Sequence, residues 1–252
     1  YRHAGLPLAE VRFNEGFAGE FAANRARYDW LHDRLEDEQS RSLLRQLLAF
    51  RLSYDITCLN GLLDREREQY FEDFLALRPD GETFLDVGCF DGQTSLEFAR
   101  RCPGYRAIHA FEPEPDNRRV CEAALAGLRD CHLHPVGLSD RSATLRFSAA
   151  GSASHIVEDG ALEIRVTPLD ALDCGAPSFV KIDTEGAEEA ALLGARATLV
   201  RHRPKLAIAA YHRPGDFWRL AERALDACPD YRIYLRHYTE CIYETVLFCV
   251  PR

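Results

Sequence analysis

Short apolar runs alternate with helical patterns over the last two thirds of the chain. The apolar runs predict strands over 83–87, 107–111, 132–137, 143–147, 162–167, 179–182, 205–211, 231–237 and 244–250. The helical patterns predict helices over 93–101, 116–128, 187–201 and 215–227. This alternation indicates an α/β protein with a doubly wound, mostly parallel sheet. The last two strands are too close in sequence for a crossover helix, so we expect them to form an antiparallel edge.

The first 80 residues have a different texture. Leucines recur at helical spacing over 43–48, and alternating charges over 64–68 precede the aromatic residues of 70–74. We therefore predict three or four amphipathic helices here, and a boundary at the turn formed by 78–81. The prediction is a helical cap or extension over 1–80 and a second domain over 81–252. The helices are expected to cover the ligand side of the larger domain, with a dimerisation surface as the alternative and a homodimer as a possible state.

The composition is that of an ordinary globular protein, with 46% hydrophobic and 28% charged residues in 252. Thirty-one Lys and Arg against 40 Asp and Glu give a net charge of −9, which argues against a nucleic-acid partner. No apolar run approaches the ~20 residues of a membrane span, and no signal peptide opens the chain, so we expect a cytoplasmic protein. The nine cysteines lack the spacing of a zinc or redox motif. Because the chain has no Met and begins at Tyr1, we expect flanking sequence.

Two motifs follow the first two predicted strands. The loop after 83–87 contains Asp86, Gly88 and Gly92, whose glycines let the backbone turn tightly and approach a ligand. The loop lacks the Gly-x-Gly-x-x-Gly spacing that a dinucleotide needs, and its added carboxylate suits a cationic or zwitterionic ligand. Glu112 ends the next strand about twenty residues further on, where a carboxylate can accept both hydroxyls of a ribose. Together the motifs favour an adenosine-containing ligand.

Three segments carry a resemblance to a known family. FLDVGCFDGQTSLEF (84–98), AFEPEPDN (110–117) and FVKIDTEGAEEAALLGA (179–195) resemble the FkbM-type family of S-adenosylmethionine (SAM) dependent methyltransferases. The resemblance implies the seven-stranded, Rossmann-like sheet of class I methyltransferases, SAM as cofactor, and methyl transfer to a hydroxyl of a sugar or secondary metabolite. The loop departs from the family at Phe90 and Asp91, where an Asn-containing loop is often seen.

The resemblance also implies which positions contact SAM. Asp86, Gly88 and Gly92 match the glycine motif around the methionine part, and Glu112 matches the ribose-binding acid. Ser139 or Asp140, after the third strand, falls where such proteins contact adenine.

Several groups that could handle a proton are expected at the same rim of the sheet. Asp183 and Glu185 follow the strand 179–182, His212 follows the strand 205–211, and His237 ends the strand 231–237. We predict that His212 accepts the proton of a hydroxyl, while Asp183 and His237 orient the base or the acceptor. Alternatively, His237 makes a structural hydrogen bond and the two acids cap a helix. A metal held by Asp183, Glu185 and His212 is possible but not favoured.

Two further features complete the sequence expectations. Lys181 points to the same strand face as Asp183, which can give a buried ion pair. The loop 151–155 could close over an acceptor.

The function favoured by these observations is O-methylation of a small hydroxyl-bearing acceptor by SAM. One alternative is a catalytically silent SAM-binding module that regulates or scaffolds a partner. A nicotinamide-dependent oxidoreductase is the other alternative, and the glycine spacing disfavours it.

Overall fold

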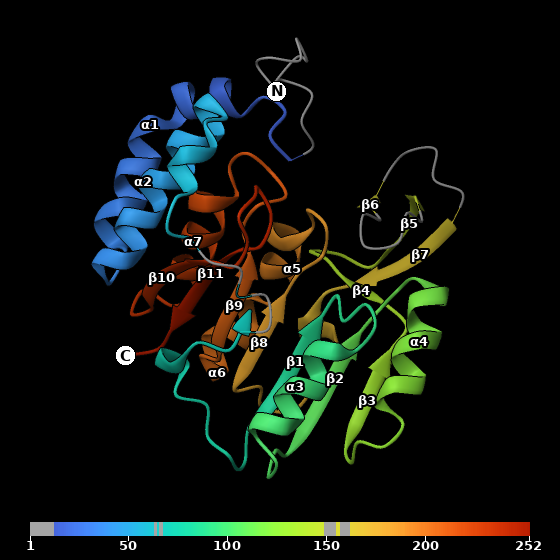
Figure 1. Ribbon diagram of the computed structural model, residues 1–252. Helices are drawn as coiled ribbons and strands as arrows, with labels where there is room; N and C mark the ends of the chain where they lie inside the picture. Colours follow the sequence, from blue (N-terminus) through green and yellow to red (C-terminus); the bar gives the residue numbers. More distant parts are fainter. Residues whose placement is uncertain (1–12, 63–64, 66–67, 149–154, 157–161) are drawn as a thin grey trace.

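The fold is that of a computed structural model, which describes residues 13–62, 65, 68–148, 155–156 and 162–252. Seven strands form a large sheet in the order β10-β11-β9-β8-β1-β2-β3 (Figure 1). The strands are β1 (Thr83–Val87), β2 (Ala107–Phe111), β3 (Cys131–His134), β8 (Phe179–Ile182), β9 (Lys205–Ala209), β10 (Arg232–His237) and β11 (Thr245–Val250). Only β11 runs antiparallel to its neighbours in this sheet. The predicted seven-stranded, mostly parallel sheet with an antiparallel edge is confirmed.

The central strands are apolar because both faces of the sheet are covered. Every residue of β1 and β8 is buried, as in parallel sheets that lie between two layers of helices. On one face, Leu85 and Val87 join the larger hydrophobic core. On the other face, Phe84 stacks against Phe98 and Phe179 at centroid distances of 4.4 and 5.0 Å.

Helices cover both faces of the large sheet. α3 (Gln93–Arg101) and α4 (Pro115–Leu125) contribute to the cores of one face, and α5 (Glu188–Gly194), α6 (Arg196–His202) and α7 (Asp216–Ala227) to the core of the other. The single helix predicted over 187–201 is therefore two helices, which meet at Ala195.

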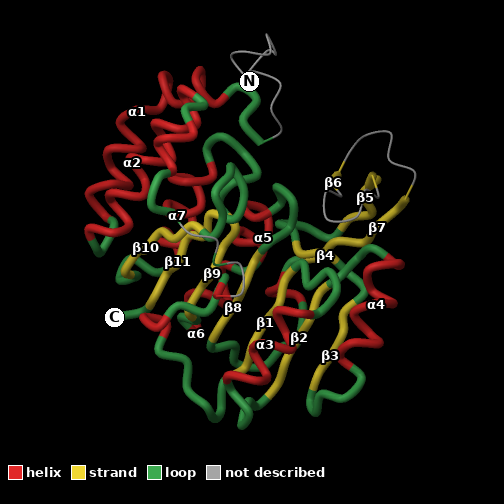
Figure 2. The backbone as a smooth tube through the Cα atoms, in the orientation of Figure 1, coloured by secondary structure: helices red, strands yellow, loops and turns green. Residues whose placement is uncertain are grey.

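A second sheet of four short strands stands beside the large one (Figure 2). Its order is β4-β7-β5-β6, with β4 (Gly137–Leu138), β5 (Ala143–Ser148), β6 (His155–Ile156) and β7 (Leu162–Thr167). The strand predicted over 132–137 is divided between β3 and β4, which belong to different sheets. Pro135 lies between them and has no N–H to continue a ladder, which accounts for the division.

The N-terminal region contains two α-helices, α1 (Phe17–Arg34) and α2 (Glu38–Ser53), and the short 3₁₀ helices η3 (Ile56–Leu59) and η5 (Asp73–Leu75). The expected amphipathic helix through 64–74 is wrong for the residues described there, which form turns and 3₁₀ helix. Tyr70 and Ala76 adopt left-handed φ values of 70° and 44°, which a continuous α-helix excludes.

We had expected the two N-terminal helices to cover the ligand side of the sheet, but they do not. α1 and α2 pack side by side against α7 and the edge strand β10 (Figure 1). Asp37, the N-cap of α2, forms an ion pair of 2.7 Å with Arg236 on β10, and Trp218 on α7 donates to Glu20 on α1. Their apolar faces share one core with α7 and β10, so the helices extend the sheet domain at this edge.

Within the described residues, no helix is both long and apolar enough to cross a bilayer.

Candidate active site

A cavity of about 720 Å³ opens at the carboxyl ends of the central strands. The chain leaves β1 for β2 on one side and later returns to β8 on the other, so this is where the strand order reverses. Doubly wound sheets bind ligands at such a point. We call this space the rim cavity, and residues that line it include Gly88, Phe90, Glu112, Ser139, Asp183 and Glu185.

The backbone of the loop after β1 lies against the backbone that directly follows the neighbouring strand β8. Gly88 has a φ of 75°, and a Cβ at this position would lie 1.8 Å from the carbonyl oxygen of Asp183. Only glycine fits this approach. Gly92 also has a left-handed φ, 84°, but it caps α3 and packs near Cys121 and Leu125 instead of lining the cavity. The prediction of a ligand-facing glycine therefore matches the place of Gly88 and not that of Gly92.

Asp86 does not line the rim cavity, in contrast to its predicted contact with the methionine part of SAM. Its carboxylate is fully buried, lies 3.2 Å from Lys181 Nζ and accepts a hydrogen bond of 2.7 Å from Ser95. Lys181 also donates to the carbonyl oxygen of Gly88 at 2.6 Å. Lys181 thus forms the predicted buried ion pair, but with Asp86 and not with Asp183, and its bond to Gly88 fixes the first loop.

Glu112 reaches the rim cavity from the end of β2. Its two carboxylate oxygens accept the backbone N–H groups of Phe90, at 3.1 Å, and Glu114, at 2.9 Å. Burial raises the pKa of Glu112 to about 7, although these two N–H groups act to lower it. Each oxygen has a further lone pair, so the carboxylate can still accept hydroxyl donors from a ligand in the cavity.

The two residues proposed near an adenine lie in different places. Ser139 lines the rim cavity and is 9% exposed. Asp140 is exposed, is not among the residues that line the cavity, and pairs with Arg141 at 3.5 Å. Of the two alternatives, only Ser139 is placed to face a ligand.

The turn after β8 and the residue after β9 bring three acids around one imidazole. His212 Nε2 lies 3.6 Å from Asp183 Oδ1 and 3.7 Å from Glu185 Oε2, and its Nδ1 lies 3.0 Å from Glu188 Oε1. Asp183, Glu185, Glu188 and His212 are called the acidic cluster below. Asp183 and Glu185 line the cavity, whereas the His212 side chain is only 1% exposed. The predicted convergence of strand ends is confirmed for these residues.

The acidic cluster holds His212 in its protonated form. Burial alone would lower the pKa of this ring, but the charge of Glu188, followed by those of Asp183 and Glu185, raises it to about 10. A ring with this pKa carries both of its protons at pH 7 and cannot accept another. This electrostatic environment opposes the role of a base that was predicted for His212.

His237 does not join the acidic cluster, so its predicted orienting role is not supported. The ring is buried, its Nδ1 lies 2.8 Å from the hydroxyl of Thr245, and it is not among the residues that line the cavity. Burial lowers the pKa of His237 to about 4. Although β10 ends at the same rim, it is the edge strand of the sheet, and β11 and β9 separate it from β8. The structural alternative describes this histidine.

The turn after β8 has two consecutive residues in a left-handed backbone conformation. Glu185 has a φ of 55° and Gly186 a φ of 100°, while Glu188 accepts the backbone N–H groups of Thr184 and Gly186. A left-handed conformation costs a residue with a side chain on the order of 1 kcal/mol. Such strain is typical of functional sites.

Several cavity residues were not predicted from the sequence. Tyr243 and Glu244 come from the connection between β10 and β11, and Tyr211 directly precedes His212. Phe13 precedes α1 and packs edge-on against His212 at 5.1 Å between ring centroids. Of these, Tyr211 had a sequence signal, because it follows β9 at the rim. Residues 149–154, which include most of the loop expected to close over an acceptor, lie outside the described residues.

The lining of the rim cavity is acidic. Among the residues that the structure describes, its lining includes one arginine, Arg213, and five carboxylates, those of Glu112, Asp183, Glu185, Glu189 and Glu244. This charge favours a cationic ligand and opposes pyrophosphate or a nucleic-acid backbone.

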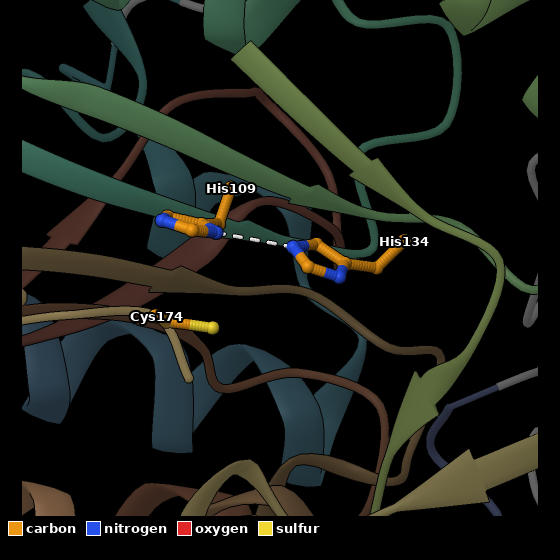
Figure 3. A group of neighbouring side chains, drawn as sticks. All are labelled: His109, His134 and Cys174. Carbon is orange, nitrogen blue, oxygen red and sulfur yellow. Dashed lines mark hydrogen bonds between the residues drawn. The ribbon is translucent and has the colours of Figure 1, made fainter. Parts of the chain in front are cut away.

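A second group of potential metal ligands lies away from the cavity. His109, His134 and Cys174 come together beside β2 and β3, and His109 Nδ1 lies 3.1 Å from His134 Nε2 (Figure 3). Burial lowers the pKa of both imidazoles, and the rings stack at 5.3 Å. Because the two rings pair with each other through one nitrogen each and none of the three residues lines the cavity, we interpret the group as core packing.

Comparisons with known proteins agree with this fold. The structure of methyltransferase FkbM from Methylobacillus flagellatus superimposes with a TM-score of 0.81 and 28% identity, over 92% of this chain and 60% of that chain. This chain thus spans about three fifths of that protein. A search of curated sequences found no match.

Two further solved structures are more distantly similar. A precorrin-6y C5,15-methyltransferase from Geobacter metallireducens has a TM-score of 0.44 and 17% identity, over 71% of this chain and 83% of that chain. An rRNA methylase from Streptococcus thermophilus has a TM-score of 0.46 and 13% identity, over 71% of this chain and 94% of that chain. These two are too distant to bear on the activity.

The family comparison covers the chain from the end of β1 through β10 and most of the residues that line the rim cavity. Residues 86–243, more than half of the chain, match the methyltransferase FkbM domain. This chain therefore belongs to the methyltransferase FkbM domain family.

Proposed function

We propose that this protein transfers the methyl group of SAM to a hydroxyl oxygen of a small acceptor, such as a sugar or secondary metabolite. The observation that carries the proposal is the rim cavity itself, where the glycine loop and Glu112 lie beside the acidic cluster. One cavity thus offers a place for a cationic methyl donor and groups that can take up a proton. Both are needed for methyl transfer to a hydroxyl.

The cofactor would lie across the first loop. We assign the ribose hydroxyls to Glu112, the methionine part to the backbone at Gly88, and the adenine to the side of Ser139. The sulfonium and ammonium charges of SAM would then face the acidic lining, which compensates for their loss of water. Asp86 and Gly92 act behind this surface, by fixing the loop and the start of α3.

The acceptor proton would leave through the acidic cluster. We assign the proton to Asp183 or Glu185, because these carboxylates reach the cavity while His212 is already protonated. Asp183 is oriented by Tyr70, whose hydroxyl donates to Oδ2 at 2.7 Å. His212 would then act by balancing the charge of the carboxylates, which modifies the role predicted for it from the sequence.

The acidic lining also separates this proposal from its alternatives. A nicotinamide dinucleotide would bring a pyrophosphate against five carboxylates, which is electrostatically unfavourable. A catalytically silent SAM-binding module is compatible with the cofactor half of the cavity, so turnover distinguishes it from an enzyme.

The test is an intact-mass screen of hydroxylated acceptors with SAM and the purified chain. We expect an acceptor to gain the mass of one methylene, with SAM converted to its demethylated product, S-adenosylhomocysteine (SAH). Tight NAD binding without SAM binding in calorimetry would contradict the proposal. SAM binding without turnover of any acceptor would favour the silent module.

A further inference from the structure

The acidic cluster has the donor atoms and spacing of a cation site. Donor atoms of Asp183, Glu185 and His212 all lie within 4.8 Å of one another, at the edge of the rim cavity. We propose that these three side chains bind a divalent cation of the Mn²⁺ or Mg²⁺ class. The sequence had ranked a metal below a histidine base, and the geometry reverses that order.

One ring nitrogen of His212 points to the carboxylates without bonding to them. Nε2 is buried and has no hydrogen-bond partner, and its distances of 3.6 and 3.7 Å to Asp183 and Glu185 exceed those of a hydrogen bond. Ligands about 2.1 Å from one ion lie about 3.0 to 3.6 Å apart, depending on the angle between them. A small closure of the carboxylates around Nε2 would therefore complete the site.

The other ring nitrogen faces a buried carboxylate, as it does in metal-binding histidines, although the contact lacks the geometry of a hydrogen bond. Nδ1 faces Glu188 Oε1 at 3.0 Å. Glu188 is buried and fixed by the N–H of Thr184 at 2.7 Å and that of Gly186 at 3.2 Å. A histidine that binds a metal usually donates its second N–H to a carboxylate in this way, which orients the ring and strengthens the ligand. This contact fixes the direction in which Nε2 faces.

The donor set selects the class of ion. Two carboxylates and one imidazole suit a hard to borderline divalent cation, and no cysteine belongs to the acidic cluster. Three carboxylates around a neutral, metal-bound imidazole carry a charge of about −3, which a divalent ion reduces to about −1. On binding, the ion takes the lone pair of Nε2, and the proton of that nitrogen leaves to solvent.

The role of the ion rests on the proposed function. Three protein ligands leave positions open toward the cavity, where a hydroxyl of the acceptor can bind. The positive charge would acidify that hydroxyl and pass its proton to a carboxylate or to water. Chelation should therefore lower methyl transfer and leave SAH binding nearly unchanged.

The test measures Mn²⁺ binding to the full chain by the loss of the free-ion signal in electron paramagnetic resonance. We expect one site in the wild type and a loss of at least about tenfold in affinity in Asp183→Asn and in Glu185→Gln. Glu189→Gln is the matched control, because Glu189 also lines the cavity but pairs with Arg223 at 3.0 Å. It should bind Mn²⁺ within about twofold of the wild type. Thermal unfolding of each variant confirms that it is folded.

The outcomes separate the ion from the proposed function. Absence of saturable Mn²⁺ binding, or equal binding in all four proteins, would overturn the cation site. Calorimetry with SAH on the same samples is independent of the ion. Failure to bind SAH would refute the proposed function and leave the Mn²⁺ result interpretable.

Discussion

The charge of Glu112 should control the affinity for the cofactor product SAH. The perturbation is Glu112→Gln, which keeps the size of the side chain and removes its charge. Hydroxyl donors of a ribose favour the ionised carboxylate, so binding should weaken as pH falls through the pKa of about 7. Below this pH, the ligand must bind a protonated acid or displace its proton.

The magnitude follows from the ionised fraction. With a pKa of about 7, Glu112 is about 91% ionised at pH 8 and about 9% at pH 6, so the wild-type affinity should fall about tenfold between these values. Glu112→Gln removes a hydrogen-bonded charge. The NH₂ group of the new amide would also face the backbone N–H of either Phe90 or Glu114, so that two donors face each other. We expect a loss of about 1.5 to 3 kcal/mol, or roughly 10- to 150-fold at pH 8, with little pH dependence.

The assay is isothermal calorimetry with SAH at pH 6, 7 and 8. Glu114→Gln is the matched control, because Glu114 is also buried and two residues away, but it caps α4 through Asn117 at 2.6 Å. Dividing the wild-type affinity for SAH by that of Glu114→Gln at each pH removes the effect of the titration of the amino group of SAH. Equal wild-type affinity at pH 6 and pH 8, or equal losses in the two variants, would refute the assignment of the ribose to Glu112.

Three further predictions concern the framework of the site. Gly88→Ala should lower SAH affinity more than tenfold in calorimetry, because the added Cβ would lie 1.8 Å from a backbone oxygen. Gly81 has a similar φ of 78° but open space around an added Cβ, so Gly81→Ala should leave the affinity unchanged. Arg51→Met should lower the free energy of unfolding in urea by about 3–5 kcal/mol, because buried Arg51 donates to the carbonyls of Phe13, Tyr211 and Ile242. Arg45→Met, at an exposed position on the same helix, should change this free energy by less than about 1 kcal/mol. Equal effects within either pair would contradict these explanations. Burial acts to raise the pKa of Asp37, but hydrogen bonds from Arg236 and Ser40 lower it to about 2. The ionised Asp37 should therefore stabilise the fold above pH 4, and this stabilisation should be lost as the pH falls to 2. Because Asp37 is one third exposed, we expect this stabilisation to be about 1 kcal/mol. The free energy of unfolding should then fall less between pH 7 and pH 3 in Asp37→Asn than in the wild type. Identical losses in the two proteins would exclude the ion pair as the cause.

The sequence by itself determined the sheet and the location of its ligand site. Strands such as β1 and β8 are continuous apolar runs because both of their faces are buried, so their pattern is local and readable. The position of a residue directly after such a strand places it at the rim, which is why Glu112, Asp183, Glu185 and His212 were found. The motifs around them also sufficed to indicate the family.

The tertiary structure decided which rim residues face the ligand and how they are charged. Asp86 and Gly92 match the motif as well as Gly88 does, yet only Gly88 reaches the cavity, because Lys181 and α4 cover the other two. The place of α1 and α2 depended on the apolar surfaces of α7 and β10, which no local pattern shows. His212 looked like a free base in the sequence, but its charge state depends on Glu188, twenty-four residues away along the chain. Electrostatic environments are sums over neighbours in space, so a residue's protonation follows from the fold and not from its own position in the sequence.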